Sequence, residues 1–197
     1  MCGEQHCCEA TNLIGSRLPE ITLKALKDDK FSDVNLKDLR GKWLVLFFYP
    51  ADFTFVCPTE LGELADMYES FKKEGAEVMS VSTDTVFVHK AWHDSSDTIA
   101  KIKFPMAADP TASLSRWLGV YLPEEGVSLR GSFVVDPEGV IQAYEIHANN
   151  IGRNIQELLR KLQAAKYCQE NDAEVCPVNW QPGKKTLKPG IELVGKL

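Results

Sequence analysis

The chain has 197 residues, of which 44% are hydrophobic and 25% are charged, as is typical of one globular domain with a substantial core. Acidic residues outnumber basic ones by 28 to 22, which gives a formal net charge of −6. This excess argues against nucleic acid and anionic membranes as main partners, because both require clustered Lys and Arg. No apolar run approaches the length of a membrane span, and residues 1–15 lack the features of a secretory signal. We therefore expect a cytoplasmic protein.

Six cysteines stand at positions 2, 7, 8, 57, 168 and 176. An even number indicates a disulfide scaffold mainly in short secreted chains that cannot build a core. In a reducing compartment cysteines are more often catalytic, metal-binding or simply buried. Their number alone does not choose among these roles.

The N-terminal half predicts a hairpin followed by a buried strand. Residues 21–26 and 30–36 alternate in a strand-like manner on either side of Asp28-Asp29, which favours a β-hairpin. Residues 43–49, WLVLFFY, form a continuous apolar run. Such a run is typical of a strand that is buried on both faces of a sheet.

Helices and strands are expected to alternate along the rest of the chain. A helix is predicted where four apolar residues recur at helical spacing before Gly75: Leu61, Leu64, Tyr68 and Phe71. There follow a strand over 76–82, a helix over 85–102, a strand over 106–109, a helix over 113–118 and a hairpin over 132–147 that turns at 136–139. Six residues mark one face of a last amphipathic helix: Ile151, Ile155, Leu158, Leu159, Leu162 and Ala165.

This order of elements indicates an α/β fold, with a central mixed β-sheet flanked by helices. We divide the chain into three parts. Residues 1–12 form a flexible, cysteine-containing N-terminal segment, and residues 13–167 form the domain. Residues 168–197 form an extended C-terminal arm, because this stretch is polar and carries two Pro-Gly pairs.

Cys57 stands where the buried strand gives way to the first predicted helix. Pro58, which lacks an N–H, is tolerated only near a helix start, so Cys57 lies at or just inside the first turn. The unpaired amides and positive end of a helix favour a thiolate, which is the reactive form of cysteine. The alternative is a buried, inert cysteine, the commoner fate of a lone core thiol. A polar loop with Asp52 and Thr54 precedes Cys57 and makes that alternative weaker.

Ionisation alone cannot supply an enzyme's rate. Lowering a thiol pKa from about 8.5 to about 6 raises its ionised fraction at neutral pH only about thirty-fold. Enzymes typically supply a factor of at least about 10⁶. The remainder requires hydrogen-bond donors that are set around the reacting bond, and Thr54 with nearby backbone amides is a local candidate.

Residues 50–60, PADFTFVCPTE, resemble the active-site motif of peroxiredoxins, Pro-x-x-x-Thr-x-x-Cys, with Pro50, Thr54 and Cys57 at the motif positions. The longer string FFYPADFTFVCPTELGELADMY, together with VSTDT, HKAWH, SFVVDPEG, EVCPVNW and ELVGKL, is similar to typical two-cysteine peroxiredoxins of the bacterial alkyl hydroperoxide reductase C type. The resemblance runs from about Leu13 to Leu197.

The resemblance implies a thioredoxin-like fold and a thiol-dependent peroxidase without a cofactor or metal of its own. Cys57 would be the peroxidatic cysteine, which attacks a hydroperoxide and becomes a sulfenic acid. Thr54 would hydrogen-bond the peroxide and the thiolate, and Pro50 would shield the site from water. Arg130 would stabilise the thiolate and the transition state.

Glu60 and Arg153 match a supporting network that orients Arg130 in the family. Without the resemblance, each of these charged residues would be interpreted as a solvated surface group. Arg130 in particular stands in no pattern that would mark it on its own.

Cys176 matches the family's resolving cysteine, a role that requires a second thiol to react with the sulfenic acid. In typical two-cysteine members that residue belongs to the partner subunit. The resemblance therefore implies an intersubunit Cys57–Cys176 disulfide, a homodimer and a ring of five dimers. The first helical turn at Cys57 would unwind so that the two sulfurs can meet. A flavoprotein disulfide reductase or a thioredoxin-like protein would then reduce the disulfide.

The remaining cysteines depart from that minimal pattern. Cys2, Cys7 and Cys8 lie beside His6 and could bind a metal with Cys168. Their spacing matches no zinc signature, so incidental thiols on a mobile terminus are the simpler interpretation. Cys168 could be an alternate resolving or shuttling thiol, although a half-buried spectator is the simpler role.

Two functions from other classes remain alternatives. Some members of the family act as holdase chaperones in larger assemblies, which only an aggregation-suppression assay would establish. A thioredoxin-type oxidoreductase would carry Cys-x-x-Cys. Here Pro58, Thr59 and Glu60 follow Cys57, which disfavours that function.

Overall fold

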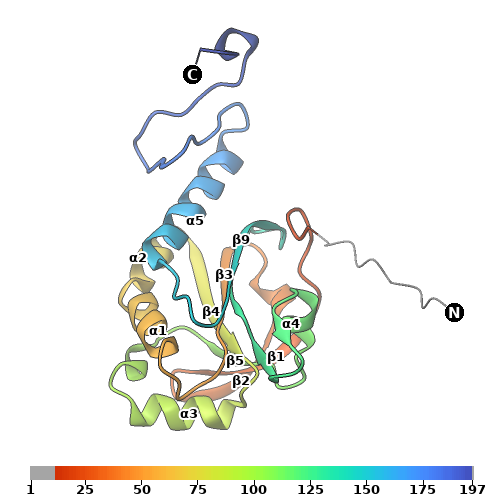
Figure 1. Ribbon diagram of the computed structural model, residues 1–197, viewed down its shortest axis with the longest axis vertical. Helices are drawn as coiled ribbons and strands as arrows, with labels where there is room; N and C mark the ends of the chain where they lie inside the picture. Colours follow the sequence, from red (N-terminus) through yellow and green to blue (C-terminus); the bar gives the residue numbers. More distant parts are fainter. Residues whose placement is uncertain (1–11, 197) are drawn as a thin grey trace, which may run out of the picture.

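The computed structural model describes residues 12–196 (Figure 1). Cys2, Cys7, Cys8 and His6, and with them the suggested N-terminal metal site, lie outside the described residues. A seven-stranded mixed sheet forms the centre, in the order β2-β1-β5-β4-β3-β8-β9. Its strands are β1 (Thr22–Lys27), β2 (Lys30–Asn35), β3 (Trp43–Phe48), β4 (Ala76–Ser82), β5 (Met106–Ala108), β8 (Arg130–Val135) and β9 (Ile141–His147).

The helices lie on both faces of this sheet (Figure 1). They are α1 (Cys57–Asp66), α2 (Tyr68–Lys73), α3 (Val86–Ser95), α4 (Ser113–Trp117) and α5 (Ile155–Glu170), with short 3-10 turns η1 (Leu36–Leu39), η2 (Ile99–Lys101) and η3 (Ile191–Leu193). A small separate ribbon pairs β6 (Tyr121–Leu122) with β7 (Val127–Ser128). The predicted α/β architecture with a mixed, helix-flanked sheet is confirmed.

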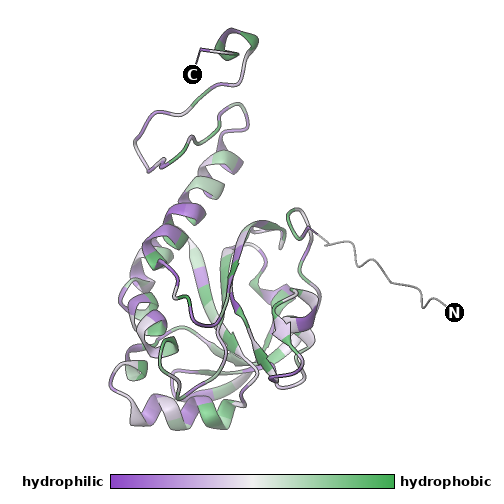
Figure 2. Cartoon of the chain, in the orientation of Figure 1, coloured by the Kyte–Doolittle hydropathy of each residue, from purple (hydrophilic) through white to green (hydrophobic). Residues whose placement is uncertain are grey.

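Strand β3 is the axis of the core. All six of its residues are buried, because it pairs in parallel with β4 on one side and antiparallel with β8 on the other. Val45 and Phe47 point into the cluster under α1, α2 and α5, whereas Leu44 and Leu46 point into the cluster that includes residues of α4. In Figure 2 the hydrophobic residues are correspondingly concentrated in the central strands. The prediction of a strand buried on both faces is confirmed.

Both predicted hairpins form. β1 and β2 pair antiparallel around Asp28 and Asp29, and these two residues have φ values of 48° and 61°, the left-handed conformation that a two-residue hairpin turn requires. β8 and β9 pair antiparallel around residues 136–140. Asp136 stabilises this second turn by accepting hydrogen bonds from the Glu138 and Val140 amides at 2.9 Å each.

Three predicted helix boundaries are wrong. The helix expected over 85–102 ends at Ser95, since Ser95, Ser96 and Asp97 are residues whose side chains compete with helical hydrogen bonds. The helix expected through Leu61 to Phe71 is interrupted at Met67, between α1 and α2. Ile151 precedes α5, which begins at Ile155 because the Asn154 side chain caps it through the Glu157 amide.

Helix α5 also continues beyond residue 168, where we expected the arm to begin. It ends at Glu170, and the Asn171 side chain there donates a 2.9 Å hydrogen bond to the Tyr167 carbonyl. Cys168 therefore lies in the last turn of the helix. Past this turn the arm extends beyond the end of α5 (Figure 1).

The arm is anchored by an aromatic contact and a short backbone pairing. Trp180 is 3% exposed and its ring centroid lies 5.0 Å from that of Tyr167. Val175 and Leu187 exchange two backbone hydrogen bonds, of 2.9 and 3.0 Å. Among residues 12–196 no helix combines the length and the apolar character needed to cross a membrane.

A substitution at Gly131, which lies in β8 beside Arg130, tests how tightly this part of the core is packed. A Cβ atom there would lie 2.8 Å from Val120 Cγ1 and 2.9 Å from the Phe133 ring. We expect Gly131→Ala to destabilise the protein by about 1–3 kcal/mol through overpacking. Gly152→Ala is the matched control, since its nearest neighbour would be Val56 Cγ1 at 3.5 Å. Thermal unfolding at one protomer concentration measures both variants; equal midpoints would contradict the expectation.

Candidate active site

Cys57 is the first residue of α1 and is fully buried. The chain leaves β3 at Phe48, passes through the loop 49–56 and enters the helix with Pro58 in its first turn, as the sequence predicts. No side chain caps this end of the helix: the preceding residue, Val56, makes no side-chain cap hydrogen bond. The Thr59 and Glu60 amides bond the Val56 carbonyl, at 3.0 and 3.2 Å, and Pro58 has no N–H. The positive end of the helix dipole is therefore what favours negative charge at Cys57.

Arg130 reaches Cys57 from the first position of β8. Its Nη1 lies 3.4 Å from Cys57 Sγ and donates a 2.8 Å hydrogen bond to Glu60 Oε2. Its Nε and Nη2 donate to the carbonyl of Asn149 at 3.0 and 2.8 Å. The guanidinium is therefore fixed on both edges, with one N–H face directed at the sulfur.

Glu60 lies one helical turn after Cys57 and binds a second arginine. Arg153 donates to Glu60 through its backbone amide at 2.8 Å, through Nε at 2.9 Å and through Nη2 at 2.9 Å. Arg153 Nη1 donates in turn to the Gly131 carbonyl and to Ser132 Oγ, at 2.9 and 3.1 Å. One carboxylate thus joins α1, β8 and the segment before α5.

This network is buried, which sets its electrostatics. Burial alone would raise the pKa of the Glu60 carboxyl, but hydrogen bonds and charge from Arg153, together with Arg130, hold that pKa below its ordinary value. The Arg153 guanidinium also lies 3.4 Å over the Phe47 ring, a favourable cation–π geometry. The carboxylate is consequently ionised at neutral pH and keeps both cations in place.

Pro50 and Thr54 lie in the loop that leads to Cys57. Pro50 is buried directly after β3, and Thr54 is half-buried. The Thr54 hydroxyl donates a 2.8 Å hydrogen bond to the Ala51 carbonyl, so it braces the loop. The structure thus brings Cys57, Arg130, Glu60 and Arg153 into one hydrogen-bonded group and places Pro50 and Thr54 in the adjoining loop.

A second buried network, which the sequence did not reveal, supports the same loop. Asp52 accepts a 2.7 Å hydrogen bond from the Tyr49 hydroxyl and lies 2.7 Å from His89 Nδ1. His89 Nε2 lies 3.2 Å from the Ala107 carbonyl. Burial, with the nearby Asp52 charge, raises the pKa of Tyr49 well above its usual range. His89 therefore has a structural role, fixing the loop to β5.

Asn149 is the other functional residue that sequence reasoning missed. It acts on Arg130 through its backbone carbonyl, so its side-chain identity carries no signal. Arg130 and Glu60 were found only through the family resemblance, because a single charged residue in a sequence does not show that it is buried.

Cys176 lies on the arm beside the C-terminal half of α5, away from Cys57. Its Sγ is 3.9 Å from the Ala164 carbonyl and 3.6 Å from Cys168 Sγ. Arg153, which binds Glu60, precedes the other end of the same helix. From Ile155 to Ala164 the helix rises about 13 Å, whereas a disulfide requires about 2.05 Å between sulfurs. Within one chain the two cysteines are held apart.

Comparison with known proteins agrees with this geometry. The family model described as "AhpC/TSA family" matches residues 14–144, and that of the "C-terminal domain of 1-Cys peroxiredoxin" matches residues 164–192. The chain belongs to the AhpC/TSA family. Within that family, a buried cysteine at a helix start with an arginine on its sulfur makes this chain a thiol-dependent peroxidase of the peroxiredoxin type.

Relatives within the AhpC/TSA family cover nearly the whole chain. Alkyl hydroperoxide reductase C of Salmonella typhimurium is 52% identical over 186 residues, which are 94% of this chain and 100% of that protein. The protein of the same name from Bacillus subtilis is 50% identical over the same coverage.

Solved structures of the family share the fold. The crystal structure of Enterococcus faecalis AhpC matches with a TM-score of 0.83 and 48% identity, covering 85% of this chain and 100% of that one. The reduced 2-Cys peroxiredoxin of Plasmodium vivax matches with a TM-score of 0.88 and 33% identity, covering 92% and 96%. The expected thioredoxin-like fold of the family is confirmed.

Replacing Glu60 by Gln tests the network directly. At neutral pH we expect a loss of about 3–5 kcal/mol of unfolding free energy, because two buried cations lose their counter-ion. The folded state lowers the pKa of Glu60, so ionised Glu60 contributes stability above its unfolded pKa of about 4.3. That contribution is lost as the pH falls through the lower, folded value. The difference in unfolding free energy between wild type and Glu60→Gln should therefore become smaller at acidic pH.

Urea denaturation of both proteins between neutral and acidic pH measures that difference. Asp33→Asn is the matched control: Asp33 pairs with Lys24 at 3.0 Å, and the two side chains are 61% and 71% exposed. An exposed pair of this kind is worth about 0–1 kcal/mol. Two results would contradict the role of Glu60 as the buried counter-ion. One is a loss of unfolding free energy in Glu60→Gln that does not change with pH, and the other is a loss no larger than that in the control.

Proposed function

We propose that this protein reduces hydrogen peroxide and small alkyl hydroperoxides, and that Cys57 and Cys176 of two different chains complete each turnover. The observation that carries the proposal is the 3.4 Å contact between Arg130 Nη1 and Cys57 Sγ at the start of α1. A guanidinium in that position stabilises the thiolate, and a bound peroxide would meet the same donor.

The first step is nucleophilic attack of the Cys57 thiolate on the terminal oxygen of the hydroperoxide. The S–O bond forms as the O–O bond breaks, which gives a Cys57 sulfenic acid and an alkoxide or hydroxide that takes up a proton. Arg130 and the positive end of the α1 dipole would stabilise the charge on the departing oxygen. The Thr54 hydroxyl would release the Ala51 carbonyl and donate a hydrogen bond to the peroxide instead. Pro50 would keep water out of the site.

The second step is resolution by the thiol of Cys176 from a partner chain. Condensation of the sulfenic acid with this thiol forms a disulfide and releases one water. Cys57 is fully buried, so the first turn of α1 would unwind to expose it. Three hydrogen bonds to the Val56 carbonyl stabilise that turn: from the Thr59 amide at 3.0 Å, from the Glu60 amide at 3.2 Å and from the Thr59 hydroxyl at 2.6 Å.

Strand β9 supports a dimer as the catalytic unit. It lies at an edge of the sheet, where unpaired backbone groups can join a second sheet. Glu145, His147 and Asn149, on and just after β9, each keep a buried polar side-chain atom without a partner among residues 12–196. Buried polar groups of this kind are normally paired, and an antiparallel β9–β9 contact would pair them.

A second surface supports assembly of dimers into a ring. Phe53, Phe55 and Phe87 are 56%, 92% and 71% exposed, close to the active-site loop and α3. Exposed aromatic side chains are enriched at interfaces. Two different self-complementary contacts on one chain close a ring of dimers, and a ring of five is the assembly that we propose.

A dithiol protein would close the cycle by reducing the disulfide, and we propose a flavoprotein disulfide reductase or a thioredoxin-like protein for this role. The cytoplasm, where thiols are kept reduced, is the proposed compartment. In this scheme residues 13–170, to the end of α5, form the peroxidase domain and residues 171–197 form the resolving arm.

The two-cysteine scheme is tested by non-reducing electrophoresis of protein treated with one equivalent of hydroperoxide. The test uses the Cys168→Ser protein, in which no thiol lies next to Cys176 among the described residues. We expect a covalent dimer that either further substitution, Cys57→Ser or Cys176→Ser, abolishes. Absence of this dimer, or its persistence in either double variant, would refute intersubunit resolution.

A further inference from the structure

Cys168 is a thiol beside the resolving cysteine that the two-cysteine scheme does not use. Its Sγ lies 3.6 Å from Cys176 Sγ, which is van der Waals contact. Both side chains are half-buried, and neither is in a disulfide. Forming a bond of about 2.05 Å requires the sulfurs to approach by roughly 1.5 Å.

The fold keeps this pair together. The chain leaves α5 at Asn171 and turns back, with the Glu174 amide donating to the Asn171 carbonyl at 2.9 Å. The Tyr167 hydroxyl, next to Cys168, donates a 2.6 Å hydrogen bond to Glu174 Oε2, and Thr186 binds the same oxygen. Val175, next to Cys176, pairs with Leu187. Each cysteine is thus adjacent to a residue that anchors the arm.

In this position the free Cys176 thiol is a poor nucleophile. Burial and the neighbouring Cys168 raise the pKa of Cys176 to about 11, although the Arg160 charge opposes the shift. The thiol of Cys176 therefore stays protonated while the arm rests on α5. A disulfide-bonded Cys176 in this position would have Cys168 as its neighbouring free thiol.

We propose that Cys168 is a third catalytic cysteine, which exchanges the intersubunit Cys57–Cys176 disulfide for an intrachain Cys168–Cys176 disulfide. The proposal rests on the proposed two-cysteine function. The Cys168 thiolate attacks Cys176 Sγ, the new S–S bond forms as the old one breaks, and Cys57 leaves as a thiolate. The number of disulfides is unchanged, so the step needs no oxidant or reductant.

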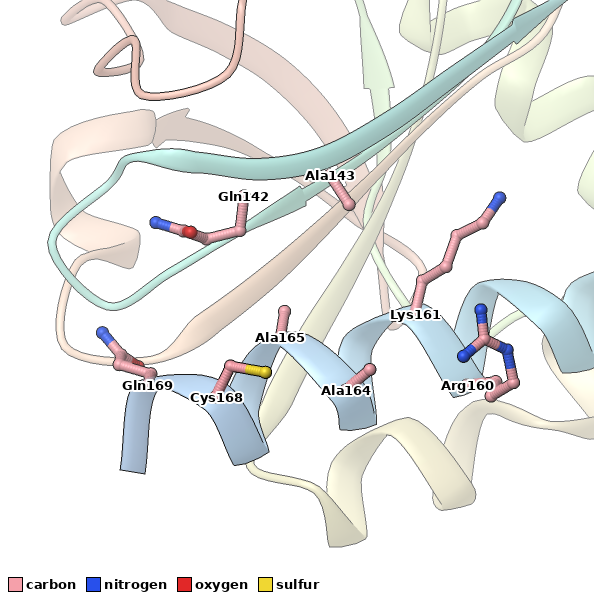
Figure 3. Close-up of a pocket in the computed structure, with 8 residues that line it drawn as sticks. All are labelled: Gln142, Ala143, Arg160, Lys161, Ala164, Ala165, Cys168 and Gln169. Atoms are coloured by element: carbon pink, nitrogen blue, oxygen red, sulfur yellow. The ribbon is translucent and has the colours of Figure 1, made fainter. Parts of the chain in front are cut away.

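This exchange would regenerate the Cys57 thiolate before an external reductant reduces the enzyme. Cys57 returns to the start of α1, where Arg130 stabilises its thiolate. The oxidising equivalent now resides on the arm. There, Cys168 lines an open groove of ≈ 460 Å³ between α5 and β9, with Arg160, Lys161 and Gln142 also at its wall (Figure 3). An external dithiol can reach a disulfide at this position without entering the active site.

Mass spectrometry separates the two disulfides cleanly. Cys168 and Cys176 fall in one tryptic peptide, residues 167–184, and Cys57 falls in another, residues 43–72. Wild-type protein receives one equivalent of hydroperoxide without reductant and is quenched with an alkylating agent over time. We expect linked 43–72 and 167–184 peptides first, and then an unlabelled 167–184 peptide that is lighter by two hydrogen atoms, with loss of the covalent dimer.

Three variants define the outcomes. Cys168→Ser should stop at the covalent dimer; if it forms no dimer, the proposed two-cysteine function fails rather than the exchange. Cys57→Ser should form no Cys168–Cys176 disulfide, because the exchange starts from oxidised Cys57. The double variant Cys168→Ser, Glu170→Cys moves the thiol about 200° around the α5 axis, away from Cys176. Its reaction should also stop at the covalent dimer.

The exchange is refuted by either of two results. One is a wild-type protein that keeps the linked peptides as fully as Cys168→Ser does. The other is a Cys57→Ser protein that forms the intrachain disulfide as fast as wild type.

Discussion

The carboxylate of Glu60 lies between two buried guanidinium groups, and the active-site end of the molecule is assembled around it. Arg130 and Arg153 both bind Glu60 Oε2, at 2.8 and 2.9 Å. Neither arginine could remain buried without this counter-ion, because an unpaired buried charge costs several kcal/mol. A residue of α1 thereby fixes the first residue of β8 and the segment before α5. The position of Arg130 on Cys57 is a consequence of this constraint.

The constraint explains how a buried cysteine could be reactive, as we propose for Cys57. A helix start favours a thiolate, but ionisation contributes only a small part of the acceleration that enzymes reach. Arg130 is held on both edges, by Glu60 and by the Asn149 carbonyl, and so it cannot turn away when charge develops on a departing oxygen. Preorganised donors of this kind are usually the largest single contribution to catalysis. In the proposed scheme the arm supplies a second thiol from a partner chain.

The sequence predicted those parts of the protein that depend on local pattern. The apolar run at β3, the two hairpins and the position of Cys57 beside Pro58 follow from periodicity and from the chemistry of turns and helix starts. The start of α5 depends on a capping hydrogen bond of the Asn154 side chain, and the end of α3 depends on side chains around Ser95 that compete with helical hydrogen bonds. The spacing of apolar residues does not show such effects. Long-range contacts left no local trace: Glu60 and Arg153 are 93 positions apart, and Asn149 acts through its backbone.

The rate of Cys57 oxidation in Arg130→Gln tests whether Arg130 stabilises the charge on the departing oxygen. Glu60 keeps Arg153 as a counter-ion in this variant, so the fold should persist. Stopped-flow oxidation by a hydroperoxide is compared with alkylation by iodoacetamide, which requires the thiolate but no O–O cleavage. We expect oxidation to slow by about 10²–10³-fold and alkylation to slow by less than about tenfold. Equal slowing of both reactions would show that Arg130 stabilises only the thiolate and not the departing oxygen.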